Sequence, residues 1–459
     1  MSLGFVSGDV AGHNRETPVM RIAWVTPYQK SSAIGRFSRL VAEAFDARGH
    51  SITLISSDRL QLSENHPPPA GTDLLHWSFF ERYPAAADAY DLIVYNIGDH
   101  YERHFGSLRL IDRHPGLCII HDFYLVNLFL GWSAGVERTL AHSVVSSLYG
   151  ENVANQFWNR IGRPDFLEWS VAETPMTEWI ACKALAAIAH APFYRWRLTD
   201  GCAGPVSVVA LAYDAPLPFP MIRDRTEFVR ILTVGTVNKT KRVQSVITAI
   251  AASSILRNRC EYNIVGQIEE PYRIILQAQI DDLKLNNAVR LHGYINDVEL
   301  GNCFVESDIV CCLRLPTLEG ASATCIEAML YGKAVLVMDT GFYGSIPSDF
   351  VIKIRRADEV EDLRHNLERL VLDPGERHSL GRRAKDWAEL EYAPDTYVQR
   401  IEPLFKAAVG ERPLFDALRQ IASVLQILRV QPDDSMVRQI GSEFHKLFCG
   451  GTPKDQYGI

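Results

Sequence analysis

The run Arg21-Ile22-Ala23-Trp24-Val25-Thr26-Pro27 predicts a buried strand near the start of the chain. A helical pattern follows over residues 37–48, and Gly49-His50 ends that helix before a second strand at 51–56. Two consecutive strands joined by a helix pair in parallel. The chain therefore opens as a Rossmann-like α/β unit.

The same alternation continues in two series separated by a proline-rich segment. In the first series, strands are predicted at 91–97 and 117–121, and the aromatic-rich stretch 125–196 is helical without firm element bounds. In the second series, strands at 229–234, 262–265, 289–291, 309–313 and 334–338 alternate with helices at 243–256, 273–283, 298–306 and 323–331. Residues 205–226 contain Pro205, Pro216, Pro218 and Pro220 without a strand or helix period, which is typical of a linker.

The predicted fold class is α/β, with two parallel sheets that each carry helices on both faces. Ligands of such open sheets bind beyond the carboxyl ends of the strands. A linker between the two sheets places a cleft between these ends. That cleft is the predicted active site.

The composition limits the classes of function. The chain has 459 residues, which fits two domains of about 200 residues each. A formal net charge of -8 gives no general attraction for nucleic acid or anionic lipid, so local groups must hold any anionic ligand. The nine cysteines contain no CxxC pair, which is typical of reduced cytosolic thiols and not of a disulfide framework or a zinc site. No apolar run reaches the roughly 18 residues that cross a bilayer.

Two glutamates eight residues apart, Glu319 and Glu327, lie in the stretch Pro316-Thr317-Leu318-Glu319-Gly320-Ala321-Ser322-Ala323-Thr324-Cys325-Ile326-Glu327-Ala328-Met329. Glu319 stands where a loop gives way to a helix, and Glu327 follows about two turns later. The amides at the helix start, over Gly320, Ala321 and Ser322, attract a diphosphate, and the two carboxylates accept hydrogen bonds from hydroxyl groups. This segment is a candidate nucleotide-sugar site. The alternative is a solvated helix with two unrelated surface carboxylates.

Together with Tyr331-Gly332-Lys333-Ala334-Val335, this segment resembles the glutamate-pair motif of the retaining glycosyltransferases of family four (glycosyl transferases group 1), which have the GT-B fold. The resemblance covers about residues 20–405 and is strongest over 229–339. It implies that a hexose-type sugar moves from a nucleoside diphosphate, UDP or GDP, to an acceptor hydroxyl. It also implies that Glu327 binds the ribose and Glu319 binds hydroxyls of the sugar.

The resemblance implies a role for each part of the chain. Residues 20–212 are expected to form an N-terminal Rossmann-like acceptor domain, and 213–392 a C-terminal Rossmann-like nucleotide-sugar domain. Residues 393–409 correspond to a helix that crosses back to the first domain. Residues 1–19 are expected to be a disordered leader, and 410–459 an extra helical tail.

The expected diphosphate contacts follow the strand that ends at Gly235. The family has an arginine just after this glycine and a lysine five residues further on, and both neutralise the leaving diphosphate. Lys241 matches the lysine, but Thr236 stands where the arginine is expected. Arg242 or Lys239 is the candidate replacement for the missing charge, and a solvated basic turn is the alternative.

Positions in the first domain complete the predicted site. His121 ends a buried strand and matches a histidine that lies against the donor sugar in the family; the alternative is a core histidine satisfied by backbone. Gly35 resembles a glycine that lets the backbone approach donor phosphate or acceptor, although a plain helix-entry glycine fits as well. Asn96 and Asp99 follow another strand and are candidate acceptor contacts. Asp122 is expected to orient its loop or cap a helix.

No metal or other cofactor is predicted. The sequence has no Asp-x-Asp and no His, Cys and carboxylate cluster with metal-ligand spacing, so helix amides and Lys241 would neutralise the diphosphate. This disfavours the metal-dependent GT-A class of glycosyltransferase. Two other functions stay open: another GT-B enzyme, such as a nucleotide-sugar epimerase or a phosphorylase, and a non-catalytic partner of another glycosyltransferase, which the departure at Thr236 and the unusual tail favour.

The tail after Gly410 has apolar residues at helical spacing in two groups: Leu414, Leu418, Ile421, Leu425 and Leu428, then Val437, Ile440, Phe444 and Leu447. This pattern predicts a helical hairpin broken near residues 432–434. The apolar stripes would cover either the chain's own domains or an interface with an oligomer or a partner.

The acceptor is not identified by these residues. By resemblance it is a glycan, a lipid-linked intermediate or a protein, in the synthesis of cell-surface polysaccharide or glycoconjugates. The predicted location is the cytoplasm, including the inner face of the membrane.

Overall fold

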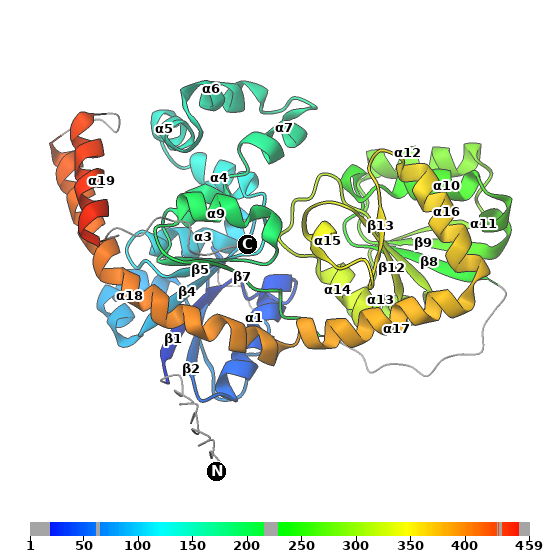
Figure 1. Cartoon of the computed structure of the whole chain (residues 1–459), viewed down its shortest axis with the longest axis horizontal. Coiled ribbons are helices and arrows are strands. Elements are labelled where there is room, and N and C mark those ends of the chain that lie inside the picture. Colours follow the sequence, from blue (N-terminus) through cyan, green and yellow to red (C-terminus); the bar gives the residue numbers. More distant parts are fainter. Residues whose placement is uncertain (1–18, 61–64, 215–227, 429, 431–433, 449–459) are drawn as a thin grey trace, which may run out of the picture.

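The computed structural model describes residues 19–60, 65–214, 228–428, 430 and 434–448. Residues 1–18 of the predicted leader, residues 215–226 of the predicted linker, residues 432–433 of the expected break in the tail and the end of the tail lie outside these residues. Two α/β domains lie next to each other, and two long helices run beneath them and connect the second domain back to the first (Figure 1).

The N-terminal sheet has seven strands in the order β3-β2-β1-β4-β5-β6-β7, all parallel. They are β1 (Arg21–Thr26), β2 (Ser51–Ser56), β3 (Asp73–His76), β4 (Leu92–Ile97), β5 (Leu117–Ile120), β6 (Ala186–Ala189) and β7 (Val206–Val208). The strands β1, β2, β4 and β5 were predicted, whereas β3, β6 and β7 were not. The strands β3 and β7 are short and half exposed, so they lack the apolar pattern that marks a strand.

The helices of this domain are α1 (Ala33–Asp46), α2 (Ser78–Arg82), α3 (Tyr101–Ile111), α4 (Val126–Ser133), α5 (Arg138–Tyr149), α6 (Glu151–Arg160), α7 (Phe166–Glu173), α8 (Thr177–Ala181) and α9 (Arg195–Gly201), with the 3-10 turns η1 (Pro84–Ala89) and η2 (Pro192–Tyr194). The stretch 125–196 therefore contains five short helices and strand β6. Short helices show too few turns for a clear period, which explains why their bounds were not predicted.

The C-terminal sheet has six parallel strands in the order β10-β9-β8-β11-β12-β13. They are β8 (Val229–Val234), β9 (Cys260–Val265), β10 (Val289–Gly293), β11 (Ile309–Cys312), β12 (Ala334–Met338) and β13 (Ile352–Ile354). Alternate residues of β11 and β12 are buried in two different apolar clusters, one on each face of the sheet. This two-sided burial is why these strands are continuously apolar in the sequence.

The helices of this domain are α10 (Val243–Ala251), α11 (Ser254–Arg259), α12 (Glu270–Asp282), α13 (Asp297–Glu306), α14 (Ala323–Leu330), α15 (Gly341–Ser345), α16 (Glu359–Leu372) and α17 (Pro374–Glu391), with the 3-10 turn η3 (Lys239–Lys241). The helix predicted at 243–256 is two helices. The break occurs because the Ser253 hydroxyl accepts a hydrogen bond from the Leu256 amide at 3.2 Å and caps the start of α11.

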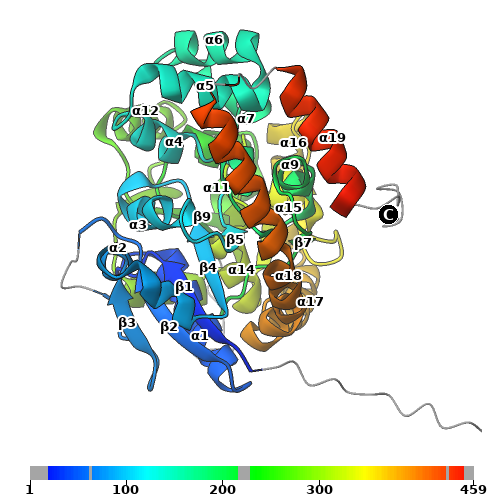
Figure 2. The ribbon, with the colours of Figure 1, turned by 90° about the vertical axis from the view of Figure 1, so that its left-hand side faces the viewer.

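Helix α18 (Pro394–Ile427) crosses from the second domain to the first (Figure 2). Its Phe405 ring stacks on Phe45 of α1 with 5.3 Å between centroids, and its Glu402 carboxylate accepts from Arg48 Nη2 at 2.7 Å. The helix continues past Gly410, so the crossover helix and the first half of the tail are one element and not two. Helix α19 (Ser435–Phe448) then turns back from its end.

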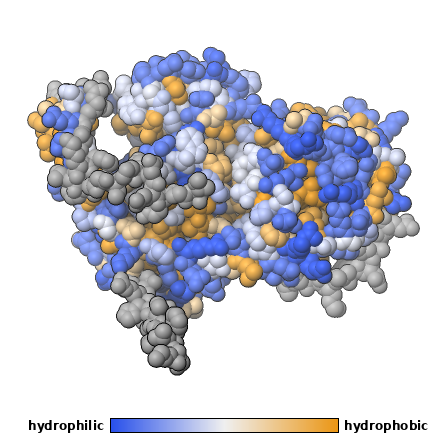
Figure 3. All heavy atoms as spheres, viewed as in Figure 1, coloured by the Kyte–Doolittle hydropathy of each residue, from blue (hydrophilic) through white to orange (hydrophobic). Residues whose placement is uncertain are grey.

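The tip of α18 carries apolar side chains at the surface. Val424, Ile427 and Leu428 are 54%, 79% and 64% exposed, and this region is apolar in the space-filling view (Figure 3). Nearer the domain, Phe415 packs against the N-terminal core and Arg419 donates to the Asp112 carbonyl. The tail therefore contacts its own N-terminal domain along one part of its length and exposes apolar groups along another.

Candidate functional site

The carboxyl ends of the two sheets meet at backbone contacts between the domains. The Gly320 amide donates to the His121 carbonyl oxygen at 2.8 Å, and the Tyr124 amide donates to the Leu318 carbonyl at 2.9 Å. These contacts bring the loop before α14 against the end of β5. Two cavities lie in the cleft beside them.

The first cavity has a volume of about 380 Å³ and lies mainly in the N-terminal domain. Its walls come from the loop before α1, the start of α3, the ends of β4, β5 and β6, and the first turn of α14. Its polar lining side chains include Asp99, Arg103, His121, Asp122, His190 and Tyr213.

The second cavity has a volume of about 360 Å³ and joins both domains. The C-terminal domain contributes two cations, one carboxylate and the start of α14, and the N-terminal domain contributes two carboxylates and a tyrosine. The lining residues are Asp99, Asp122, Tyr124, Lys241, Arg314, Leu318, Glu319, Ala321, Ser322, Ala323 and Thr324. The second cavity therefore brings together five of the predicted residues: Glu319, Lys241, Asp99, Ala321 and Ser322.

Lys241 is held against the end of β8. Its Nζ donates to the Val234 carbonyl, and a Cβ on Gly235, whose φ is +103°, would lie 2.8 Å from that nitrogen. Glycine is therefore required here both for its backbone conformation and for the room it leaves to the lysine. Burial, followed by the neighbouring Arg314, lowers the pKa of Lys241 to about 8.

Arg314 is the second cation of this cavity, and the sequence analysis missed it. Its Nε lies 3.2 Å from Glu319 Oε1, and its Nη1 donates to Thr240 Oγ1 at 2.7 Å. It lies two residues after the apolar strand β11 and five residues before Glu319, and this position near the carboxyl end of a buried strand was the available signal. Arg314 therefore places a second positive charge in the cavity with Lys241.

Glu319 is ionised in this setting. Although burial raises the pKa of a carboxyl group, the Arg314 guanidinium and the hydrogen bond from the Tyr343 hydroxyl at 2.6 Å outweigh it, so the pKa of Glu319 is lowered. Its carboxylate is therefore a preformed acceptor for hydroxyl groups next to two cations.

Arg242 does not contribute to the cavity, which corrects the prediction for this residue. It adopts a left-handed conformation with φ of 55°, and its Nη2 lies 2.5 Å from Glu359 Oε2 on α16. The other candidate for the missing charge, Lys239, is exposed and belongs to neither of the two cavity walls described above.

The start of α14 is positioned by its cap. The Ser322 hydroxyl accepts from the Cys325 amide at 3.3 Å, and residues from Ala321 to Thr324 line the second cavity. A Cβ on Gly320 would meet the Tyr194 hydroxyl and lie 2.8 Å from the His121 carbonyl oxygen. Glycine at this position is what allows the loop to approach the N-terminal domain.

Glu327 lies apart from Glu319. It is 7% exposed, belongs to neither cavity wall, and accepts a hydrogen bond from the Tyr213 hydroxyl at 3.1 Å. Burial raises its pKa to about 7, against the lowering effect of Arg36 and of Tyr213. The two glutamates are thus not brought into one cavity, and the second is held by the segment that leaves the N-terminal domain.

His121 lines the first cavity but has a partner at each ring nitrogen. Nε2 lies 3.0 Å from Asn96 Oδ1, and Nδ1 lies 3.2 Å from His190 Nε2. Burial, with His190 and His104, lowers the pKa of His121 well below its ordinary value. The neutral ring therefore faces the cavity without a free nitrogen.

Asn96 does not reach the cleft, which corrects its prediction as an acceptor contact. The residue is fully buried, its Nδ2 donates to the Val25 carbonyl at 3.2 Å, and its Oδ1 faces His121. Its place is beneath His121. Gly35 likewise lies inside the start of α1, where a Cβ would be 2.8 Å from the Pro27 carbonyl oxygen, so it serves close packing of the helix on the loop.

Asp99 and Asp122 form the N-terminal side of both cavities. Asp122 Oδ2 accepts from the Asp99 amide at 2.9 Å, and Asp99 Oδ1 accepts from the Leu128 amide at 2.8 Å. Burial raises the pKa of Asp99 to about 8 and that of Asp122 to about 6. The raised pKa favours the protonated form of Asp99, although both of its oxygens already accept hydrogen bonds, Oδ2 from Asn127 Nδ2 at 2.6 Å.

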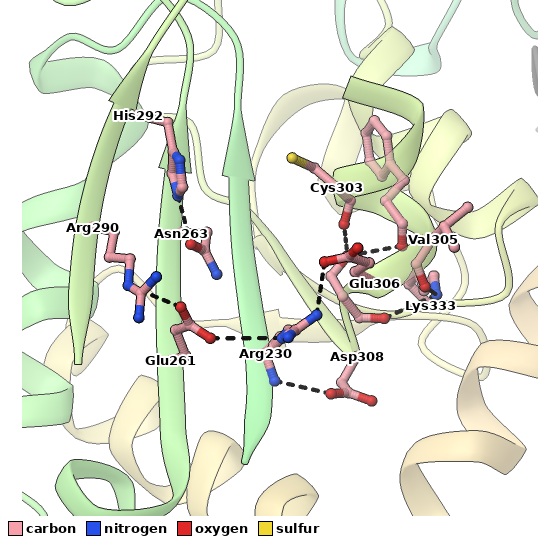
Figure 4. Close-up of polar contacts among 12 residues, drawn as sticks. Arg230, Glu261, Asn263, Arg290, His292, Cys303, Val305, Glu306, Asp308 and Lys333 are labelled. Atoms are coloured by element: carbon pink, nitrogen blue, oxygen red, sulfur yellow. Dashed lines mark hydrogen bonds and ion pairs between the residues drawn. The ribbon is translucent and has the colours of Figure 1, made fainter. Parts of the chain in front are cut away.

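A polar face elsewhere on the C-terminal sheet is satisfied internally (Figure 4). Arg230 lies 2.7 Å from Glu306, Arg290 lies 3.0 Å from Glu261, and His292 lies 2.6 Å from Asn263. Over the described ranges, no group of three or more His, Cys, Asp and Glu residues has metal-binding geometry. In the same part of the chain, no helix combines the length and apolar composition needed to cross a membrane.

Residues 222–387 match the model of the family named Glycosyl transferases group 1, which includes Lys241, Arg314 and both glutamates. None of the curated proteins matches the chain.

The fold resembles solved GT-B glycosyltransferases. HepE of Anabaena, solved with UDP and glucose, is 15% identical over 84% of this chain and 99% of its own, with a TM-score of 0.56. Sucrose-phosphate synthase of Thermosynechococcus elongatus is 16% identical over 86% and 99%, with a TM-score of 0.55. WaaG, described as a glycosyltransferase of lipopolysaccharide biosynthesis, is 15% identical over 84% and 99%, with a TM-score of 0.53. The predicted α/β architecture of two Rossmann-like domains with a helical C-terminal segment is confirmed.

Proposed function

We propose that this chain is a retaining glycosyltransferase that moves a sugar from a nucleoside diphosphate sugar to an acceptor hydroxyl. The observation that carries this proposal is the second cavity, where Lys241, Arg314 and the start of α14 surround one ionised carboxylate, Glu319. Two cations and helix amides fit a diphosphate, and a carboxylate between them fits the hydroxyls of the attached sugar.

In the proposed reaction, the bond between the anomeric carbon and the diphosphate oxygen breaks, and the acceptor oxygen bonds to the same face of that carbon. The acceptor proton passes to a phosphate oxygen of the leaving nucleoside diphosphate. Lys241 and Arg314 stabilise the negative charge that grows on this leaving group. Glu319 holds the sugar, and Glu327 is assigned to the ribose.

The acceptor is assigned to the N-terminal side of the cleft. Asp99 lines both cavities, so it is suited to orient an acceptor hydroxyl. His121 is assigned to the donor sugar, with its ring oriented by Asn96. UDP is proposed as the nucleotide because HepE is solved with UDP, and a cell-surface glycan is proposed as the acceptor because WaaG takes part in lipopolysaccharide biosynthesis.

The reaction is proposed to need no metal, because protein groups supply positive charge at the diphosphate. Arg314 lines the same cavity as Lys241 and is proposed to supply the cation missing at Thr236, which favours a catalytic role over that of a non-catalytic partner. We assign the protein to the cytoplasm, because the eight cysteines in the described ranges are free thiols, as expected in a reducing compartment.

The test is a panel of UDP-, GDP- and ADP-sugars. Ligands of the folded state raise the melting temperature, and a catalyst slowly releases nucleoside diphosphate even with water as acceptor. We expect one nucleotide class to do both, with the released sugar in the anomeric configuration of the donor. Binding without any release would support the non-catalytic partner, and an epimerised donor would support a nucleotide-sugar epimerase.

A further inference from the structure

Three residues connect the N-terminal domain to the buried glutamate of α14. Arg36 on α1 donates through Nη1 to the Tyr213 hydroxyl at 2.8 Å, and its guanidinium carbon lies 4.4 Å from the centre of the Tyr213 ring. The Tyr213 hydroxyl lies 3.1 Å from Glu327 Oε2. Because a guanidinium only donates, the tyrosyl proton is directed at the carboxylate.

The Arg36 guanidinium is held in place by a second residue, Asp214. Its Nη2 donates to the Asp214 carbonyl at 2.6 Å and to Asp214 Oδ1 at 2.8 Å. Asp214, Tyr213 and Arg36 therefore form one chain of contacts that ends on a single oxygen of Glu327. No hydrogen bond within the described part of the chain is assigned to the second oxygen, Oε1.

We propose that Tyr213, oriented by Arg36, is a positioning residue that presents the Glu327 carboxylate to the ribose of the donor. The proposal rests on the proposed function, because it takes Glu327 as the ribose contact. It makes donor binding depend on the N-terminal domain and on the segment after β7, although the carboxylate belongs to the C-terminal domain.

The groups that act on Glu327 come from three elements. Arg36 on α1 and the Tyr213 hydroxyl lower its pKa, whereas Asp214 beside the linker and Asp297 at the start of α13 raise it. Burial is the largest effect and places the pKa at about 7. Removing Tyr213 or Arg36 is therefore expected to shift the ionisation of Glu327 to higher pH.

The experiment measures the affinity for UDP-glucose by calorimetry between pH 6 and 9, since both phosphates of this probe are diesters and do not titrate in this range. Tyr213→Phe removes one hydrogen bond to the carboxylate and is expected to raise the midpoint of the low-pH limb by roughly one pH unit. That shift corresponds to roughly eightfold weaker binding than wild type at pH 6.5 and less than twofold at pH 9. Arg36→Met is expected to shift it at least as far.

Tyr95→Phe is the matched control, because it also removes a buried tyrosyl hydrogen bond, 2.6 Å to the His114 carbonyl, at a residue outside the walls of both cavities. Its pH profile should equal that of wild type. If Tyr213→Phe lowered the affinity equally at every pH, or did not lower it at all, the positioning role of Tyr213 would be wrong. If Glu327→Ala binds UDP-glucose like wild type at every pH, the assignment of Glu327 to the ribose fails instead, so the two failures are distinct.

Discussion

The Gly320 amide and the His121 carbonyl oxygen, 2.8 Å apart, form a hydrogen bond between the two domains at the centre of the cleft. Gly320 follows Glu319 directly, and His121 directly follows β5. The position of the Glu319 carboxylate is therefore set by the N-terminal domain as well as by its own.

Gly320→Ala is expected to displace this loop, because the added Cβ would meet the Tyr194 hydroxyl and the His121 carbonyl. We expect a stability loss of about 1 to 3 kcal/mol from overpacking and a fall in sugar transfer of roughly tenfold or more from the misplaced carboxylate. Gly410→Ala is the control, since a Cβ there has no atom within 4 Å among the described residues. Unchanged transfer by a folded Gly320→Ala variant would contradict the importance of this contact.

Arg314→Ala is expected to weaken nucleotide binding by roughly 10- to 100-fold, as for the loss of hydrogen bonds to a charged group. Arg242→Ala should reduce stability by breaking the pair with Glu359, but leave the nucleotide affinity near that of wild type. Titration of both variants with UDP checks the assignment. The opposite ranking would restore Arg242 as the diphosphate contact.

Donor affinity should be greatest between pH 7 and 8. Glu327, with a pKa of about 7, becomes a carboxylate as pH rises through that value and then accepts the ribose hydroxyls. Lys241, with a pKa of about 8, loses its positive charge above that pH, while Asp99, with a pKa of about 8, gains a negative one. The loss of charge on Lys241 removes an attraction for the diphosphate, and the negative charge on Asp99 repels it.

Calorimetry with UDP-glucose measures this profile. The double variant Lys241→Met/Asp99→Asn should bind more weakly than wild type, but its affinity should stay level above pH 8. A fall in affinity that persists in the double variant would show that another group titrates in the site.

Transfer should survive EDTA, because Lys241, Arg314 and the start of α14 neutralise the diphosphate. The measurement compares nucleoside diphosphate release with and without chelator. Loss of activity in EDTA that Mg²⁺ or Mn²⁺ restores would show that a cation takes part.

Glu319 and Lys241 were assigned through the resemblance to the family's motifs, and the structure brings both to the wall of the second cavity. The partners of Glu327 could not be predicted in this way, because Tyr213 and Arg36 come from two segments far from it in sequence. Arg242 was misassigned since its left-handed backbone and its contact with Glu359 depend on the packing of α16. That a residue is an arginine does not tell whether its side chain points into the cleft or toward another helix.

The strands of the fold were likewise predicted only where the local apolar pattern is strong. Strands β11 and β12 are buried on both faces and were predicted from their apolar runs, whereas β3 and β7 are held mainly by pairing with their neighbours in the sheet. The boundary expected after residue 409 came from the extent of the family resemblance, whereas α18 continues without a break from Pro394 to Ile427.

Truncation separates the two parts of the tail. Ending the chain at Ile427 removes α19 but keeps the contacts of Phe415 and Arg419 with the N-terminal domain, so the melting temperature should change little. Ending it at Val409 cuts α18 and removes those contacts, which exposes apolar surface and should cause aggregation or a change in oligomeric state. Nucleotide binding should persist in any soluble fraction of either protein, because both cavities lie in the cleft. Light scattering with a UDP titration tests this prediction. Unchanged mass and solubility of the shorter chain would show the tail to be dispensable. Lost UDP binding in a folded truncation would place the tail close to the cleft.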